Sequence, residues 1–277
     1  MTSSHFRSTG FYVFASIAIS LFGAPCNSTV NGDELPSAES ILDGHITATG
    51  GKAAYEKLKT RKTTGTLEID MSGHQVKAKV EIHHQAPNQS HMVIQGGGLY
   101  IVRATNGIDA WEWRAGHSHG DENSEPNDDT HLLDGPDKQR ALEQAQFHDK
   151  LNWRKTFKSV KTVGVVKLNE KPAYEVEVTP NHGESFKQYY DQETGRLVKY
   201  TRPFETSMGK LDMEVHLNQY KEFDGVMMPT FVKHVLTSPA IGSGTQIWNY
   251  TNFEHNIKVP SDLFKLPEEL AKEHDGN

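Results

Sequence analysis

The pattern of hydrophobic and polar residues changes its period near residue 62. Before that point, apolar side chains recur at helical spacing over residues 37–49, between the favourable N-cap Ser37 and Gly50-Gly51. A shorter segment, residues 52–60, has the same character. The pattern therefore predicts two short amphipathic helices, whose buried sides are formed by Ile41, Leu42, His45 and Thr49 in the first and by Ala54, Tyr55 and Leu58 in the second.

From residue 62 onward, hydrophobic and polar residues alternate, which is typical of half-buried β-strands. Residues 67–71 and 76–82 alternate in this way, and Ser72-Gly73-His74 between them is short enough for an antiparallel hairpin. Further strand-like segments are 90–95, 99–104, 109–114, 158–168, 174–178, 189–200 (a strand, a turn and a strand), 211–217, 226–237 and 244–253. We therefore expect about ten or eleven strands in one antiparallel sheet, with too few helices for repeated βαβ crossovers.

A helix-bearing insertion is predicted in the middle of the chain, at about residues 121–150. Its first part, Asp121 to Thr130, is acidic and rich in turn-forming residues, so we expect a loop there. After Asp134-Gly135-Pro136, the segment 137–150 has the spacing of a helix, with one face formed by Ala141, Leu142, Ala145 and Gln146. Such an insertion would plug or cover the open end of a curved sheet.

The N-terminus has the features of a secretory signal. A positively charged residue, Arg7, precedes a short apolar run at residues 11–24 that is too short to span a membrane. We expect a signal peptide at 1–26, a polar linker at 27–36, and a single β domain at 37–277. Cys26 directly follows the apolar run, where a bacterial lipoprotein carries its acylated cysteine. Because Pro25 replaces the small, flexible residue typical of that position, we expect ordinary cleavage, with a lipid-anchored form as the alternative.

Composition excludes several classes of function. The chain has 29 Lys and Arg against 36 Asp and Glu, a net charge of −7, and no basic stripe that could contact a run of phosphates, so we expect no nucleic-acid partner. Cys26 is the only cysteine among 277 residues. A single cysteine excludes an internal disulfide and any zinc site built from several cysteines.

The sequence Gly116-His117-Ser118-His119-Gly120 matches the G-x-S-x-G pattern of lipases and esterases. In those enzymes the serine lies between a buried parallel strand and a helix. Here the preceding segment alternates like an antiparallel strand and an acidic segment follows, so we expect a polar turn and no catalytic residue. The nearby His117, His119, Asp121 and Glu122 have donor atoms suited to a metal, but adventitious surface histidines explain them better, and we expect neither a metal nor a cofactor.

The order of these elements resembles a known family. The sequence PSAESILDGHITATGGKAAYEKLKTRKTTGTLEI, followed by NGIDAWEW, the YYDQETGRLVKY hairpin, YKEFDGVMMPTFV and DLFKLPEE, is similar to bacterial LolA-like outer-membrane lipoprotein-sorting and lipid-carrier proteins over residues 37–268. The resemblance implies an incomplete, strongly curved antiparallel β-barrel whose short helices cover an apolar cavity for acyl chains. It also implies a periplasmic location in a Gram-negative bacterium and protein partners in the cell envelope.

The predicted function is non-catalytic binding or transport of a lipid, of lipoprotein acyl chains or of another hydrophobic ligand. Residues on apolar strand faces are the candidates for lining the cavity: Leu67, Ile69, Val76, Val80, Ile82, Val176, Met213 and Val215. Two alternatives remain open at this point. The chain could be a secreted serine hydrolase that uses Ser118, or a ligand-free structural domain of the envelope with a fully packed core.

Overall fold

The computed structural model describes residues 34–71, 73–117, 126–206, 209–238 and 242–274. The helices of these ranges are α1 (Ala38–Ala48), α2 (Lys52–Glu56), α3 (Gly135–Gln144), α4 (Trp153–Thr156), the 3₁₀ helix η2 (Ser261–Phe264) and α5 (Glu268–His274). Among the described helices, none is long and apolar enough to cross a membrane.

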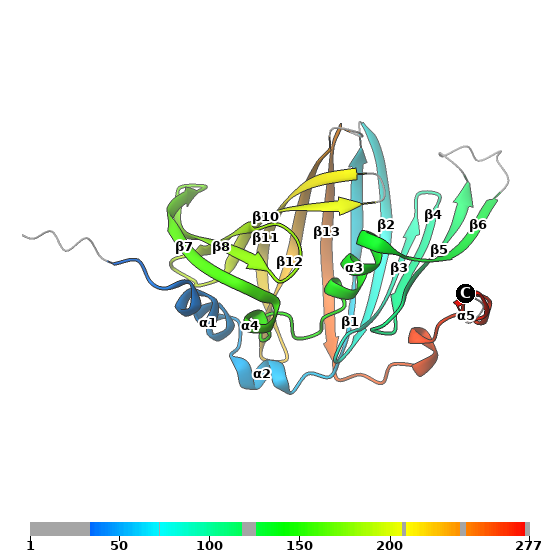
Figure 1. The fold of residues 1–277 in the computed structure, drawn as a ribbon, viewed down its shortest axis with the longest axis horizontal. Coiled ribbons are helices and arrows are strands. Elements are labelled where there is room, and N and C mark those ends of the chain that lie inside the picture. Colours follow the sequence, from blue (N-terminus) through cyan, green and yellow to red (C-terminus); the bar gives the residue numbers. More distant parts are fainter. Residues whose placement is uncertain (1–33, 72, 118–125, 207–208, 239–241, 275–277) are drawn as a thin grey trace, which may run out of the picture. The chain divides into compact units, whose positions relative to one another are not determined.

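The strands are β1 (Thr60–Met71), β2 (His74–Gln85), β3 (Gln89–Gly96), β4 (Leu99–Thr105), β5 (Ala110–His117), β6 (Pro126–Leu132), β7 (Phe157–Leu168), β8 (Lys171–Pro180), β9 (Phe186–Asp191), β10 (Leu197–Thr206), β11 (Gly209–Phe223), β12 (Val226–Ser238) and β13 (Gly242–His255). They form one 13-stranded sheet in the order β6-β5-β4-β3-β2-β1-β13-β12-β11-β10-β9-β8-β7 (Figure 1).

The sheet is antiparallel and stays open, because β6 and β7 are edge strands that do not pair with each other. The predicted fold class, an incomplete and strongly curved antiparallel barrel with short helices, is therefore confirmed. Each strand-like segment of the sequence forms a strand, and the Asp224-Gly225 turn adopts the positive φ angles, 50° and 83°, that this pair favours in hairpins.

The sheet has thirteen strands where about ten or eleven were expected, and β6 is one that the sequence pattern did not indicate. Residues 126–130 were expected to belong to an acidic loop, but they pair with β5, with Asp129 opposite Arg114. The loop prediction was therefore wrong for these residues. An edge strand needs no apolar alternation, because solvent reaches its free edge, and charged residues there oppose edge-to-edge association. The predicted helix of the same segment forms as α3, which begins at Gly135-Pro136 and buries Ala141, but it ends at Gln144, so Ala145 and Gln146 lie beyond it.

Helices α1, α2 and α3 pack on the same face of the sheet, which we call the inner face (Figure 1). Leu42 of α1 packs with Val176 of β8, Tyr55 of α2 with Met228 of β12, and Ala141 of α3 with Ala110 of β5. Helix α3 contacts both β5 and β10, which lie on opposite sides of the central pair β1 and β13. It therefore bridges the two arms of the curved sheet.

The position of α1 is fixed at both of its ends. At its start, the Ser37 hydroxyl accepts a hydrogen bond from the Ser40 amide at 3.2 Å. At its end, the Met227 amide donates to the Thr49 carbonyl at 3.0 Å. Gly50 has a φ of 122°, and a Cβ at this position would lie 2.3 Å from the Gly225 carbonyl oxygen, so only glycine fits this approach to the β11–β12 turn.

Candidate ligand-binding cavity

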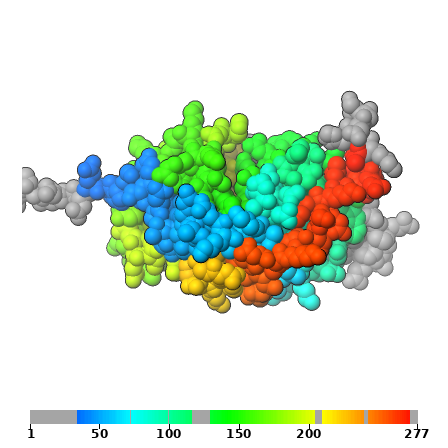
Figure 2. All heavy atoms as spheres, turned by 90° about the horizontal axis from the view of Figure 1, so that it is seen from below, coloured from blue at the N-terminus to red at the C-terminus, as the bar shows by residue number. Residues whose placement is uncertain are grey.

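A cavity of about 790 Å³ lies between α1, α3, α4 and the inner face of β8, β9 and β10. Figure 2 shows the surface hollowed between the blue atoms of the N-terminal helices and green atoms of the middle of the chain. Its apolar and aromatic wall consists of Leu42, Leu142, Trp153, Phe157, Pro180, Phe186, Tyr190, Leu197 and Tyr200. A volume of this size is within the range of about 300–1,000 Å³ that is usual for small-molecule sites.

Trp153 is held in the wall by contacts between α4 and α1. Its indole N–H donates to the Asp43 carboxylate at 3.1 Å, and Arg154 donates to both oxygens of the same carboxylate at 2.9 and 2.6 Å. The Arg154 guanidinium also lies 4.0 Å from the centre of the Trp153 ring. The hydrogen bond from Arg154 is the main reason why the pKa of Asp43 is lowered, so this carboxylate stays charged.

His45 connects α1 to the start of β10. Its Nδ1 lies 3.2 Å from the Leu197 amide and 3.2 Å from the Gly195 carbonyl, so one tautomer accepts from the former and the other donates to the latter. The ring packs edge-on against Tyr190 at 5.4 Å. Burial, assisted by the charge of Lys150, lowers the pKa of His45 to about 3. The imidazole is therefore neutral, and it adds no charge to the cavity wall.

The tyrosines of the wall are also uncharged. Burial raises the pKa of Tyr200 to about 12 and raises that of Tyr190 as well. The Tyr190 hydroxyl donates to Gln188 at 2.7 Å, whereas no hydrogen bond from the Tyr200 hydroxyl to a described residue is found. The wall thus combines aromatic surface with neutral donors.

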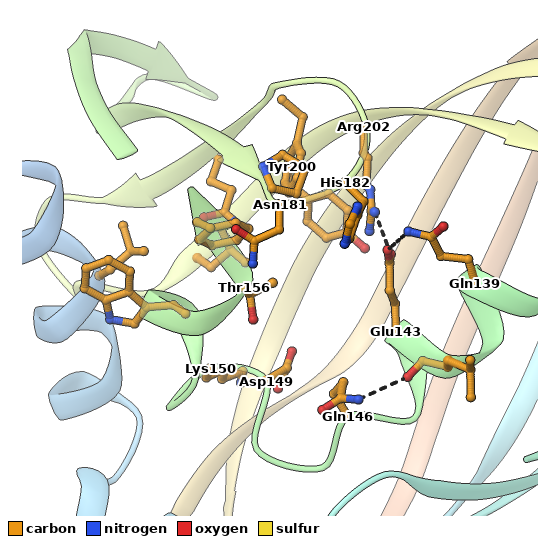
Figure 3. Close-up of a pocket in the computed structure, with 18 of the residues that line it drawn as sticks. Gln139, Glu143, Gln146, Asp149, Lys150, Thr156, Asn181, His182, Tyr200 and Arg202 are labelled. Carbon is orange, nitrogen blue, oxygen red and sulfur yellow. Dashed lines mark hydrogen bonds and ion pairs between the residues drawn. The ribbon is translucent and has the colours of Figure 1, made fainter. Parts of the chain in front are cut away.

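Several charged side chains line the cavity, and the partly exposed pair of Arg202 and Glu143 marks its solvent-facing side, which we call the mouth (Figure 3). Arg202 of β10 pairs with Glu143 of α3 at 2.6 Å, and Gln139 donates to the same glutamate at 3.1 Å. Lys150 lies with its Nζ 5.7 Å from the Tyr55 ring and forms no ion pair with a described residue. An elongated apolar molecule with a polar end would match this division between wall and mouth.

The strand register places the residues predicted from the sequence on the inner face. Residues directly opposite in an antiparallel pair share a face. One continuous row of such partners crosses most of the sheet: Val176, Gln188, Tyr200, Val215, His234, Gln246, Ile69 and Val76. The row includes four of the predicted residues and two that line the cavity, Gln188 and Tyr200.

The predicted residues nevertheless lie beside or behind the cavity, and none of them is part of its lining. Val176 packs behind the wall with Tyr190, and Met213 lies opposite Arg202. Leu67, Val80, Ile69 and Ile82 form a cluster of their own with Ala78, Ile94, Met92, Ile101 and Trp248. Their contact with a ligand therefore stays a prediction.

The sequence pattern did not identify most of the residues that line the cavity, but it placed some of them on the buried faces of expected helices. Leu142 and Gln146 had been assigned to one face of the expected helix, and both line the cavity. His45 had been assigned to the buried side of α1. Nothing in the local pattern indicated that Trp153 or Arg202 lines the cavity, because Trp153 is positioned by α1 and Arg202 by α3, which are distant in the sequence.

The G-x-S-x-G segment has a different context from that of a nucleophile elbow. Its first residues belong to β5, and the chain returns as β6, which is antiparallel to β5. A nucleophile elbow connects a parallel strand to a helix. Ser118 itself, His119, Asp121 and Glu122 lie outside the described residues, as does Cys26 with the whole signal segment. Among the described residues there is no group of His, Cys, Asp and Glu that could hold a metal ion.

No family model and no curated protein matches the sequence. Solved structures do match. A DUF1329 family protein from Desulfovibrio piger ATCC 29098 is 11% identical with a TM-score of 0.55, and the match covers 82% of this chain and 97% of that one. A LolA superfamily protein from Nitrosomonas europaea is 14% identical with a TM-score of 0.51, covering 84% and 99%. A domain from Vibrio parahaemolyticus, described as an outer membrane lipoprotein-sorting protein domain, is 13% identical with a TM-score of 0.53, covering 82% and 97%. The likeness to LolA-like proteins is thus confirmed for the fold.

Proposed function

We propose that this protein binds and carries an amphiphilic molecule, a lipid or the acyl chain of a lipoprotein, without catalysing a reaction. The observation that supports this most directly is the cavity, which has an uncharged aromatic wall and a charged mouth inside an open LolA-like sheet. Each methylene group removed from water contributes about 0.8 kcal/mol, so one chain in this cavity would be held without any ion pair.

The proposed location is the bacterial envelope, after export. The N-terminal segment has the composition of a secretory signal. The LolA superfamily fold is consistent with this location, because one solved structure with the same fold is described as an outer membrane lipoprotein-sorting domain. Envelope proteins that deliver or receive the ligand are the partners that this function would require.

A variant in the cavity wall tests the proposal. Leu142 of α3 lines the cavity, and Leu142→Glu would place a carboxylate where an acyl chain is expected. We expect the delipidated wild-type protein to bind a fluorescent fatty acid at one saturable site, and the variant to bind it at least about tenfold more weakly. The measurement is a fluorescence titration, accompanied by mass spectrometry of natively purified protein for bound lipid.

The matched control is Ile108→Glu. Ile108 is 75% exposed and does not line the cavity, so the same substitution type should leave binding unchanged. Circular dichroism must show that both variants are folded. If the wild type binds no probe of any chain length and carries no lipid, the transport proposal fails and the ligand-free structural domain is the better interpretation.

A further inference from the structure

Exposed aliphatic side chains gather at β7, the edge strand that packs against α1 and α4 (Figure 1). Four large hydrophobic residues are exposed among the described residues, and three of them lie in or beside this strand: Leu35, Val163 and Val165, with 43%, 47% and 47% of their surface exposed. Leu35 is next to β7 because the Thr162 hydroxyl donates a hydrogen bond to the Pro36 carbonyl at 2.7 Å. Single exposed aliphatic residues are normal, but a group of them at one edge indicates a surface that contacts something apolar.

The same edge is basic in an acidic protein. Residues 155–171 contain five lysines and one acidic residue, Glu170, although the whole chain has a net charge of −7. All five lysines are exposed, and none of them forms an ion pair with a described residue: Lys155, Lys158, Lys161, Lys167 and Lys171. Glu177 of β8 lies opposite Lys161 in the strand register and offsets the charge at that position only. Exposed valines and unpaired lysines thus share one strand.

Protection of the sheet edge explains the lysines but not the valines. Charged residues and bulges on an edge strand oppose pairing with another strand. The register of β7 shifts at two places, after Phe157 and after Thr162, so strand addition by a partner protein is disfavoured here. Exposed valines work against such protection, because β-branched apolar residues favour strand pairing. An apolar partner that does not pair as a strand accounts for both kinds of residue.

A membrane with anionic lipids is such a partner. Its phosphate groups attract lysines, and aliphatic side chains enter the boundary between its head groups and acyl chains. The strand also begins at the cavity, because Phe157 is its first residue and lines the cavity together with Thr156. Val163 is separated from Phe157 by roughly 20 Å of strand. A membrane in contact with the valines would therefore lie near the cavity.

We propose that the β7 edge docks on a membrane rich in anionic phospholipid, with Val163 and Val165 between the head groups and the lysines of the strand beside the phosphates. This inference goes beyond the proposed function, because it assigns a membrane-binding surface and does not depend on what the cavity holds. For a carrier, it adds the place where the ligand is taken up or delivered.

Charge reversal with a matched control tests the electrostatic attraction. Lys161→Glu/Lys167→Glu reverses two charges beside the valines, and Lys79→Glu/Lys221→Glu makes the same change in net charge at exposed lysines of β2 and β11. We expect the wild type and the control to sediment with phosphatidylglycerol vesicles, and the β7 variant to bind them at least about tenfold more weakly. Binding of the wild type should weaken as salt is added and should be weaker with phosphatidylcholine vesicles.

The valines are tested in the same sedimentation assay. Val163→Ser/Val165→Ser removes apolar surface without changing the charge, and we expect at least about threefold weaker binding to phosphatidylglycerol vesicles. Ile108→Ser is the control, because Ile108 is 75% exposed and lies in the β4–β5 turn, outside this edge. Every substituted residue is exposed, so we expect all variants to fold, and circular dichroism checks this.

Three results would contradict the assignment. If the wild type does not bind phosphatidylglycerol vesicles at low salt, membrane docking is wrong and a protein partner is the better interpretation of this edge. If the folded β7 variants bind these vesicles like their controls, the membrane meets another surface. If the β7 variants also lose the fluorescent fatty acid, the substitutions act on the cavity and not on docking.

The fatty-acid titration keeps this inference separate from the proposed function. The β7 variants should bind the fatty acid like the wild type while binding vesicles more weakly. A wild type that binds vesicles through β7 but binds no fatty acid would leave the docking surface in place and contradict the transport proposal.

Discussion

At the scale of single residues, the inner face contains a half-buried histidine, His234, that stays neutral. Burial lowers the pKa of His234 in β12 to about 4, even though a hydrogen bond with Gln246 opposes this shift. A histidine in the unfolded chain takes up a proton near its ordinary pKa of 6.5. Because the folded pKa is the lower one, the stabilisation is complete above about pH 6.5 and is lost as the pH falls towards 4.

We therefore expect the free energy of unfolding to decrease over this window, with His234 contributing up to about 1.4 kcal/mol per pH unit. His234→Gln should make the pH dependence shallower than in the wild type. His74→Gln is the control, because His74 is exposed at the β1–β2 turn. Urea denaturation at several pH values measures the effect, and parallel curves for wild type and His234→Gln would contradict it.

The sequence predicts the face of such a residue but not its environment. Alternation along β12 places His234 with Val232 and Met228 on the buried side. The neutral state of the ring follows from strands that are distant in the sequence, since Val215 and Gln246 are its cross-strand neighbours.

At the scale of elements, α3 is the helix whose position bears most directly on access to the cavity. It bridges β5 and β10, and its Glu143 pairs with Arg202 of β10 at the cavity mouth. Both side chains are about one-third exposed, 36% and 31%, so solvent screens the pair and its contribution to stability is small, about 0–1 kcal/mol. The pair can therefore restrain the mouth without being essential to the fold.

We expect Glu143→Gln to leave the melting temperature nearly unchanged and to speed ligand dissociation about two- to fivefold. The control is Glu184→Gln, which removes an exposed pair with Lys210 away from the cavity lining. Stopped-flow displacement of a bound fluorescent fatty acid measures the rate. Equal rates in the wild type and Glu143→Gln would mean that α3 does not control access to the cavity.

The contrast between α3 and β6 shows which elements can be predicted from the sequence. Helix α3 has a proline-containing start and a periodic apolar face, so its local pattern and its packing agree. Strand β6 has neither apolar alternation nor a strong strand composition, and it exists because β5 provides a partner. An element that depends on pairing alone leaves no periodic signal in its own residues.

At the scale of the whole molecule, the pairing register of the strands determines which side chains a ligand would meet if it extended from the cavity along the inner face. The candidate residues of β1 and β2 share the inner face with the cavity residue Tyr200, but four of them, Leu67, Ile69, Val80 and Ile82, belong to a separate packed cluster. The sequence correctly predicted this face, because its alternation has a period of two. It did not predict which part of the face is hollow, since that depends on where the helices leave the sheet uncovered.

Val80 distinguishes a ligand confined to the cavity from one that runs along the inner face. Val80 is 3% exposed in the packed cluster of β1, β2 and β3, whereas the next residue, Lys79, is exposed on the opposite face. If a long acyl chain displaces part of this cluster, Val80→Glu should weaken binding of long chains by about tenfold or more and leave short chains unaffected, because only the long ones reach the carboxylate.

Lys79→Glu is the control, and it should change the affinity for neither long nor short chains. Val80→Thr introduces a smaller polar group at the same position, in case Val80→Glu does not fold. Titrations over a series of chain lengths, with circular dichroism of each variant, make the measurement. If folded Val80 variants bind all chain lengths like the wild type, the β1–β3 cluster is structural and the ligand is confined to the cavity between α1, α3, α4 and β8–β10.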